Sequence, residues 1–313
     1  MNPDISPIAV VTTINDLCNT YIPDIKYPTI VVGDVKTNAS SYAEFNYISI
    51  DYNSKLSELL PRNHYARKNL GYISAKKSEC IIDTDDDTYP ISDIYDWESF
   101  NRKLVVSPRI PNILKEYTDK KIWMRGYPLT HINNTANILT EDTNQTPSVV
   151  QSIVDGHPDV DAIWRLTNDV HVSFDNNKCF VFNRGVYTQG NTQATIWTDP
   201  TTYHLLYIPS TVSFRFCDIL KMYVAQKCLW AMGKTMAVCS PIFRQNRNHH
   251  NLMDDFESEI SMYTQVEALL DILDAVELKG TPSDIVVVYK SLCDNGVVDV
   301  RELCILEEWM SLI

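Results

Sequence analysis

One stretch decides the predicted fold: Cys80-Ile81-Ile82, an apolar run typical of a strand, leads directly into Asp83-Thr84-Asp85-Asp86-Asp87. Parallel α/β sheets bind their ligands beyond the carboxyl ends of the strands, and the acidic run lies at such an end. Four carboxylates within five residues repel one another, so the cluster is costly at neutral pH unless solvent or a cation neutralises it. The stretch therefore predicts a cation site at one edge of a sheet. The alternative interpretation is a solvated acidic turn.

The segments before this stretch have the pattern of a mainly parallel central sheet. Runs rich in β-branched residues at 8–14, 29–32 and 47–50 are typical of strands. Within 62–78, apolar residues recur at i, i+4 and i+7, which predicts a helix with one buried face. Strands that alternate with helical segments indicate an α/β fold with crossover connections.

The later part of the chain changes character. Residues 130–158 are rich in Asn, Thr, Asp and Pro, which predicts a long surface loop. Residues 216–231 have a helical pattern, and the chain after Asp254 is predominantly helical. We therefore predict a catalytic domain over 1–250 and a helical C-terminal extension over 251–313 that packs on it or mediates homo-oligomer formation.

Composition excludes several classes of protein. The 313 residues include 27 Lys and Arg against 40 Asp and Glu, for a formal net charge of -13, which argues against a nucleic-acid binder. The 9 glycines contain no Gly-x-Gly pair, and the spacing from Gly185 to Gly190 continues with Asn191 instead of Lys. The Rossmann fingerprint and the P-loop are therefore absent as motifs, so any bound phosphate must be held in another way.

The cysteines and the hydropathy indicate the compartment. The eight cysteines show no Cys-x-x-Cys pair and lie mostly in apolar runs, which predicts reduced core residues. No signal peptide is visible, and no segment reaches the ~18 apolar residues of a membrane span. These features predict a soluble, cytoplasmic protein.

The acidic stretch suggests particular ligands. Mn²⁺ or Mg²⁺ takes one or two protein carboxylates and fills its other positions with water and phosphate oxygens, which a nucleotide diphosphate supplies. The position at the strand end allows Asp83 and Asp85 as the ligands. Arg67 and Lys68, on the preceding helix, are expected to contact phosphate, the arginine bidentately and the lysine as a point charge. The alternative for this pair is an exposed helix face.

Several ordered blocks resemble a known family. The segment 65–72, followed by 82–87, resembles the STELLO family of glycosyltransferase-like proteins. Later blocks occur in the same order as in that family, at 125–128, 159–167, 209–212 and 247–250, with Asp255-Phe256 after them. The resemblance implies a GT-A-type fold that binds a nucleotide-diphosphate sugar. STELLO proteins of plants also carry a membrane anchor and extra domains, so this sequence is expected to correspond to the catalytic module.

The resemblance implies a function and a metal site. It implies a metal-dependent glycosyltransferase that transfers a sugar from a nucleotide-diphosphate sugar, with a UDP-sugar as the expected donor, to a hydroxyl of a glycan or other acceptor. It places Mn²⁺ or Mg²⁺ on Asp85 and Asp87, and Asp86 then lies nearer the sugar. A catalytically silent scaffold is the alternative from a different class.

A more distant similarity leads to the reversibly glycosylated polypeptides, which are UDP-arabinopyranose mutases. Their Asp-Asp-Asp motif matches 85–87, and the self-glycosylated arginine of their Arg-Gly-Tyr-Pro segment matches Arg125. A second arginine of that family falls on Ile132 here, which departs from the pattern. The similarity implies, as an alternative, a nucleotide-sugar mutase with a transiently glycosylated Arg125.

Residues near the strand ends are expected to bind the nucleotide. In GT-A-like proteins the end of the first strand receives the nucleotide, which points to Thr12 and Thr13. Asp34 ends the second strand and is expected to contact the base or the ribose. The alternative for these residues is a local turn in which they satisfy backbone groups.

The segment 247–250 places basic side chains ahead of a predicted helix. Arg247 is expected to contact the diphosphate, and His250 or His249 to reach the metal or the diphosphate. Asp254 and Asp255 are candidates for the general base that takes the proton of the acceptor hydroxyl. Their alternative role is to stabilise a helix N-terminus.

The block 159–167 contributes two further candidates. Asp161 and Arg165 are expected to face the donor sugar or the acceptor. Trp123, Trp164 and Trp197 are candidate sugar-stacking platforms, although core packing is the ordinary role of such residues.

Overall fold

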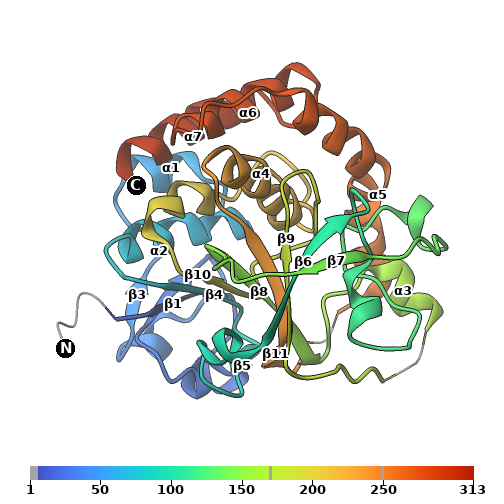
Figure 1. The fold of residues 1–313 in the computed structure, drawn as a ribbon. Helices are drawn as coiled ribbons and strands as arrows, with labels where there is room; N and C mark the ends of the chain where they lie inside the picture. The colour runs from blue at the N-terminus through green and yellow to red at the C-terminus, as the bar shows by residue number, and fades with distance from the viewer. Residues whose placement is uncertain (1–5, 169–170, 249) are drawn as a thin grey trace.

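The computed structural model describes residues 6–168, 171–248 and 250–313 and centres on one mixed sheet (Figure 1). Its 11 strands follow the order β3-β2-β1-β4-β10-β8-β11-β9-β6-β7, and β5 pairs with β11. The strands are β1 Ile8–Thr13, β2 Thr29–Gly33, β3 Asn46–Ile48, β4 Ile81–Thr84, β5 Thr88–Pro90, β6 Asn101–Ser107, β7 Leu139–Asp142, β8 Val149–Gly156, β9 Lys178–Phe182, β10 Ala194–Trp197 and β11 Met236–Gln245.

The parallel part of the sheet is the part that the sequence predicted. β1 pairs in parallel with β2 and with β4, and β2 pairs in parallel with β3. β10 then lies antiparallel between β4 and β8, while β8 and β11 are parallel again. The expectation of an α/β fold with a central sheet and C-terminal helices is confirmed.

Helices cover this sheet. They are α1 Lys55–Leu59, α2 Lys68–Ala75, α3 Ala162–Thr167, α4 Cys217–Ala231, α5 Leu252–Ala275, α6 Asp284–Asp294 and α7 Arg301–Leu312. Short 3-10 helices are η1 Leu17–Asn19, η2 Ile22–Asp24, η3 Ala39–Tyr42, η4 Tyr65–Arg67, η5 Asp96–Ser99, η6 Ile113–Glu116, η7 Leu129–His131 and η8 Pro200–Leu206. The helices predicted within 62–78 and over 216–231 are confirmed by η4, α2 and α4.

The prediction of a surface loop over 130–158 is wrong for the second half of this segment. The segment contains β7 and β8, and β8 lies at the centre of the sheet with six successive buried residues. The apolar residues of β8 follow a polar stretch directly, so the composition of the whole window concealed a strand that tertiary packing buries on both faces.

The C-terminal helices form an arc along one side of the molecule (Figure 1). α5 packs against α3 and α4, α6 against α4, and α7 against α1. Their buried apolar residues, among them Leu270, Tyr289 and Trp309, belong to the same core cluster as residues of the sheet. The indole of Trp309 also donates to the carbonyl of His204 at 3.0 Å. The helices therefore share one core with the sheet.

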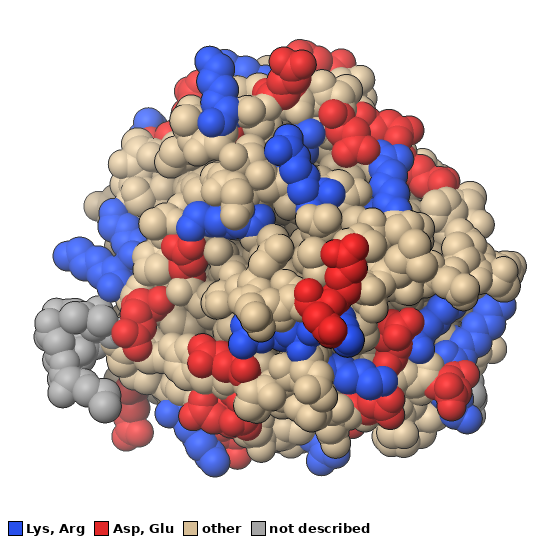
Figure 2. Space-filling model, in the orientation of Figure 1, with Lys and Arg blue, Asp and Glu red and all other residues tan. Residues whose placement is uncertain are grey.

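The surface charges are mixed in sign, and most of the cysteines are buried. On the face drawn in Figure 2, acidic and basic side chains are interspersed among uncharged ones. All eight cysteines are free and five of them are buried, but Cys18 and Cys304 are exposed and so are not core residues. None of the helices in the described ranges is both long enough and apolar enough to cross a membrane.

α2 lies very close to the sheet because Gly71 faces two strands. A Cβ at this position would meet a methyl of Val10 at 2.5 Å and one of Val32 at 2.9 Å. Both neighbours are buried, so they have little room to move. The close approach brings the N-terminal end of α2 to the carboxyl ends of β1 and β2.

We predict that Gly71→Ala lowers the free energy of unfolding by about 1–3 kcal/mol, because the added methyl overpacks this contact. Urea denaturation followed by circular dichroism measures the change. Ser74→Ala, on the exposed side of the same helix, is the control and is expected to stay within about 0.5 kcal/mol. An equal stability for the two variants would show that the sheet accommodates the methyl.

Candidate functional site

A cavity of about 610 Å³ lies at the carboxyl ends of β1, β2 and β4. The parallel register aligns Thr13 with Gly33, so the residues that follow these strands meet at one edge of the sheet. The cavity brings together eleven of the residues predicted from the sequence: Thr12, Thr13, Asp34, Arg67, Asp85, Asp86, Asp87, Arg125, Arg165, Arg247 and His250. Asp83, Lys68, Asp161, Asp254 and Asp255 do not line it.

Asp86 is held from both sides of the cavity. Its carboxylate accepts from the hydroxyl of Thr13 at 2.6 Å, from the amide of Asn15 at 2.9 Å and from the amide of Asn248 at 3.2 Å. Burial raises the pKa of Asp86, and these hydrogen bonds oppose that shift. The residue therefore links the end of β1 to the chain after β11.

Asp85 and Asp87 flank this link and have the character of a cation site. Asp85 accepts from the hydroxyl of Tyr65 and lies 3.4 Å from the ammonium of Lys68. Burial raises the pKa of Asp85 to about 7; the charge of Lys68 opposes this shift and that of Asp87 adds to it. Asp87 accepts from the side-chain amide of Gln245 at 3.0 Å and from the backbone N–H of Asn248 at 3.2 Å. A divalent cation between these carboxylates would relieve their mutual repulsion, so the residues present fit Mn²⁺ or Mg²⁺.

The described residues contain no group of three or more His, Cys, Asp or Glu side chains arranged to hold a metal. His249, a second candidate from the sequence, lies outside the described residues.

The expectations for Asp83 and Lys68 need correction. Asp83 is fully buried and forms ion pairs with Lys68 at 2.7 Å and with Lys221 at 2.8 Å. Lys68 is also fully buried, and it donates to the carbonyls of Thr84 and Thr192. Both side chains have internal partners, so neither is available to a metal or a phosphate in the cavity.

Basic residues line the cavity together with the acidic turn. Arg67 is only 2% exposed, donates weakly to Ser57 and Ile50, and has a buried Nε without a partner. Arg165 donates to the carbonyl of Pro158 at 2.6 Å, and its buried Nε also has no partner. Neither arginine forms an ion pair within the described ranges. Burial, and next the charge of Arg247, lowers the pKa of Arg165 to about 10.

Arg125 has the opposite environment. Its five N–H groups donate to the two oxygens of Asp159, the two oxygens of Asp218 and the carbonyl of Arg215. Although burial acts to lower it, these two carboxylates raise the pKa of Arg125 well above its usual value. Nothing on this guanidinium is free to attack a sugar, so the structure gives no support to the expected glycosylation of Arg125.

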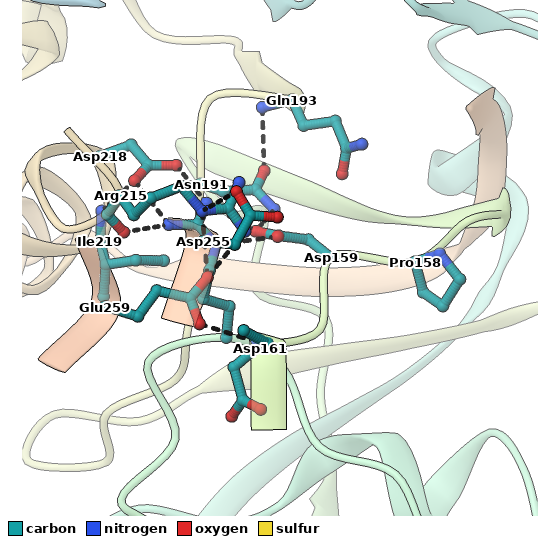
Figure 3. Close-up of polar contacts among 12 residues, drawn as sticks. Pro158, Asp159, Asp161, Asn191, Gln193, Arg215, Asp218, Ile219, Asp255 and Glu259 are labelled. Atoms are coloured by element: carbon teal, nitrogen blue, oxygen red, sulfur yellow. Dashed lines mark hydrogen bonds and ion pairs between the residues drawn. The ribbon is translucent and has the colours of Figure 1, made fainter. Parts of the chain in front are cut away.

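Two further carboxylates, Asp255 and Glu259, lie beside Arg215 (Figure 3). Asp255 pairs with Arg247 at 2.7 Å, lies 3.7 Å from Arg215, and approaches His250 at 3.3 Å. Burial would raise the pKa of Asp255, but His250 and the two arginines hold it well below its usual range. Asp255 is thus a weak base that positions the basic residues, and Asp254 is exposed at the N-terminus of α5. The expected role of these two residues as the general base is not supported.

The two candidates of the block 159–167 lie in different environments. Asp161 is fully buried and caps α3 by accepting from the N–H of Trp164 at 2.8 Å and from the indole of Trp123. Trp123, Trp164 and Trp197 are all buried, which favours core packing over sugar stacking. Only Arg165 of this block's candidates reaches the cavity.

Sequence reasoning missed several residues that line the cavity. Tyr65 and Asp159 lay inside the blocks quoted for the STELLO resemblance, and Phe214 and Arg215 lie within three residues after such a block, so position was the available signal. Asp218 carried no signal, because an acidic residue in the first turn of a helix is ordinary.

Comparison with known proteins identifies distant relatives of the chain. No protein-family profile matches the chain. The probable glycosyltransferases STELLO1 and STELLO2 of Arabidopsis thaliana are each 26% identical to it over 240 residues. The chain is a distant homologue of the STELLO proteins. The matched region covers 67% of this chain but only 29% of STELLO1 and 30% of STELLO2.

Three solved glycosyltransferase structures overlap loosely with the STELLO-like chain. Glucosyl-3-phosphoglycerate synthase from Mycobacterium tuberculosis has a TM-score of 0.43 and 12% identity, and covers 88% of this chain and 82% of its own. GalNAc-T7 has a TM-score of 0.40 and 10% identity over 98% of this chain and 56% of its own. A mannosyltransferase from Pyrobaculum calidifontis has a TM-score of 0.34 and 9% identity, and the match covers 99% of this chain and 87% of its own. At these TM-scores the structures support no inference about the reaction.

We predict that Asp218→Ala lowers the free energy of unfolding by about 3 kcal/mol, because it leaves part of the buried charge of Arg125 uncompensated. Urea denaturation measures the loss. The control is Asp271→Ala, which removes an exposed partner of Arg109 and is expected to cost under about 1 kcal/mol. Similar losses in both variants would mean that Arg125 does not depend on Asp218.

Proposed function

We propose that this chain is a metal-dependent glycosyltransferase of the GT-A type. It takes a nucleotide-diphosphate sugar as donor, with UDP as the expected nucleotide, and transfers the sugar to a hydroxyl of a glycan or similar acceptor. The supporting observation is one cavity, at the carboxyl ends of parallel strands, that combines the Asp85–Asp87 turn with two arginines, Arg67 and Arg165, that form no ion pair among the described residues.

Different polar residues of the cavity are assigned to different parts of the nucleotide sugar. Thr12 and Thr13 end β1, Asp34 follows β2, and all three are assigned to the nucleoside. Asp34 already accepts from the N–H of Val35 at 2.7 Å and from that of His64 at 3.2 Å, so its orientation is fixed. A fixed carboxylate is a suitable acceptor for a ribose hydroxyl or for an N–H group of a base.

The diphosphate is assigned to the centre of the cavity. Asp85 and Asp87 would hold Mn²⁺ or Mg²⁺, which, when bound, offsets the charge that develops on the leaving diphosphate. Arg165 and Arg247 supply positive charge from the residues that line the same cavity. The Nδ1 of His250 faces Asp255, so a contact of this residue with the diphosphate or the metal would use its Nε2.

We predict that the double variant Asp85→Asn, Asp87→Asn folds but binds UDP at least about tenfold more weakly in the presence of Mn²⁺, because neutral amides are poor ligands for a hard cation. Isothermal titration calorimetry with and without Mn²⁺ measures the difference. Asp142→Asn, whose side chain is 90% exposed, is the control. Undiminished Mn²⁺-dependent binding in the double variant would refute the site assignment.

Arg165 yields an independent prediction. Arg165→Gln is expected to weaken UDP binding by about tenfold or more, since a charge-assisted contact is lost. Its free energy of unfolding should change by less than about 1 kcal/mol, because the loss of the hydrogen bond to the Pro158 carbonyl is offset by the removal of an unpartnered buried N–H and of repulsion from Arg247. Calorimetry and urea denaturation measure the two effects, and Arg184→Gln, an exposed position, is the control. A large loss of stability would instead give Arg165 a structural role.

A further inference from the structure

A loop of the cavity wall, residues 209–216, is held by the last helix of the chain. Glu302 in α7 is fully buried, and its carboxylate accepts from the backbone N–H groups of Ser210 at 3.0 Å and Thr211 at 2.7 Å and from the hydroxyl of Tyr207. Glu302 forms no ion pair with a basic side chain in the described part of the chain. Its buried charge is therefore compensated by the backbone of the loop, as in an anion-binding nest.

The other end of the loop is held by α5. The hydroxyl of Ser213 donates to the carbonyl of Ser258, and Arg215 forms an ion pair with Glu259 at 2.7 Å. Glu259 is also fully buried. Two buried carboxylates of the C-terminal helices thus fix the loop at both ends.

Phe214 lies between these two attachments and lines the cavity. Its ring packs edge-to-face against His64, with centroids 6.2 Å apart, and against Tyr65, at 5.8 Å. The residue nevertheless remains 51% exposed, in contrast to the buried tryptophans. A large aromatic side chain that is fixed but half open to a cavity presents a surface on which a ring of a ligand can pack.

Building on the proposed function, we propose that the C-terminal helices form part of the substrate site. Glu302 fixes the loop 209–216, and the ring of Phe214 stacks on a ring of the bound nucleotide sugar. The recognised chemistry is a ring face, which either the base or the sugar of the donor can offer. In this arrangement Phe214 contacts the substrate, and Glu302 is a positioning residue that acts through it.

The first test compares Phe214→Ala with wild type in calorimetric titrations with UDP and with UDP-glucose, both in the presence of Mn²⁺. Stacking predicts about tenfold weaker binding and its recovery in Phe214→Tyr. A loss already seen with UDP assigns the ring to the base, whereas a loss confined to UDP-glucose assigns it to the sugar. Unchanged affinity for both probes overturns the inference. Tyr52→Ala, an exposed aromatic outside the cavity, is the control.

The second test is a double-variant cycle with Glu302→Gln. The amide keeps the shape but turns an N–H group or a weaker acceptor toward the loop, so binding of the same probe should weaken about fivefold or more. Because Glu302 acts through Phe214, combining this change with Phe214→Ala should add no further loss. Additive losses, or an unchanged affinity of Glu302→Gln, overturn the positioning role. Glu307→Gln on the exposed side of α7 is the control.

The outcomes separate the two proposals. If the wild-type chain binds neither UDP nor UDP-glucose, the proposed function fails and this inference fails with it. If the wild type binds but Phe214→Ala binds equally well, only this inference fails. The Phe214 variants change an exposed side chain and are expected to fold, so a Glu302→Gln chain that does not fold leaves the first test decisive.

Discussion

The buried ion pairs of Asp83 with Lys68 and Lys221 are the interaction on which the cavity depends. All three side chains are fully buried, and they join β4 to α2 and α4. A buried charge that loses its partner is strongly destabilising, so the two helices and the strand must keep their positions together. The acidic turn begins directly after this strand. The position of the proposed cation site is therefore set by buried charges beneath it, of which Lys68 also lies 3.4 Å from Asp85.

A second set of charges arranges the basic side chains of the cavity. Arg125 and Arg215 are compensated by carboxylates of α4 and α5, and Arg247 by Asp255. Arg67 and Arg165 form no ion pair with any residue that the structure describes. Compensated arginines hold their positions without a ligand, and uncompensated ones gain most when an anion arrives. The cavity therefore combines ion-paired arginines, whose positions are fixed, with unpaired arginines that an anionic ligand would stabilise.

The sequence predicts the part of this design that follows from local pattern. Apolar runs that end in polar residues predict the strands β1, β2 and β4. They also predict that Thr13, Asp34 and the acidic turn lie at the ends of these strands. Pattern could not show that the side chain of Asp83 turns toward the helices, because the strand is buried on both faces. It could not distinguish Phe214 from the buried tryptophans either, since exposure is decided by packing between distant segments. β8 was missed for the same reason.

The attachment of the loop 209–216 to α7 has a consequence for the order in which the protein is made. Ser210 leaves the ribosome 92 residues ahead of Glu302, its partner in the folded state. Domains begin to fold from the N-terminal side during synthesis, so the sheet and the acidic turn can assemble while this wall of the cavity is still unanchored. The loop 209–216 is therefore anchored only after α7 has been made and has docked, later than the sheet that carries the acidic turn.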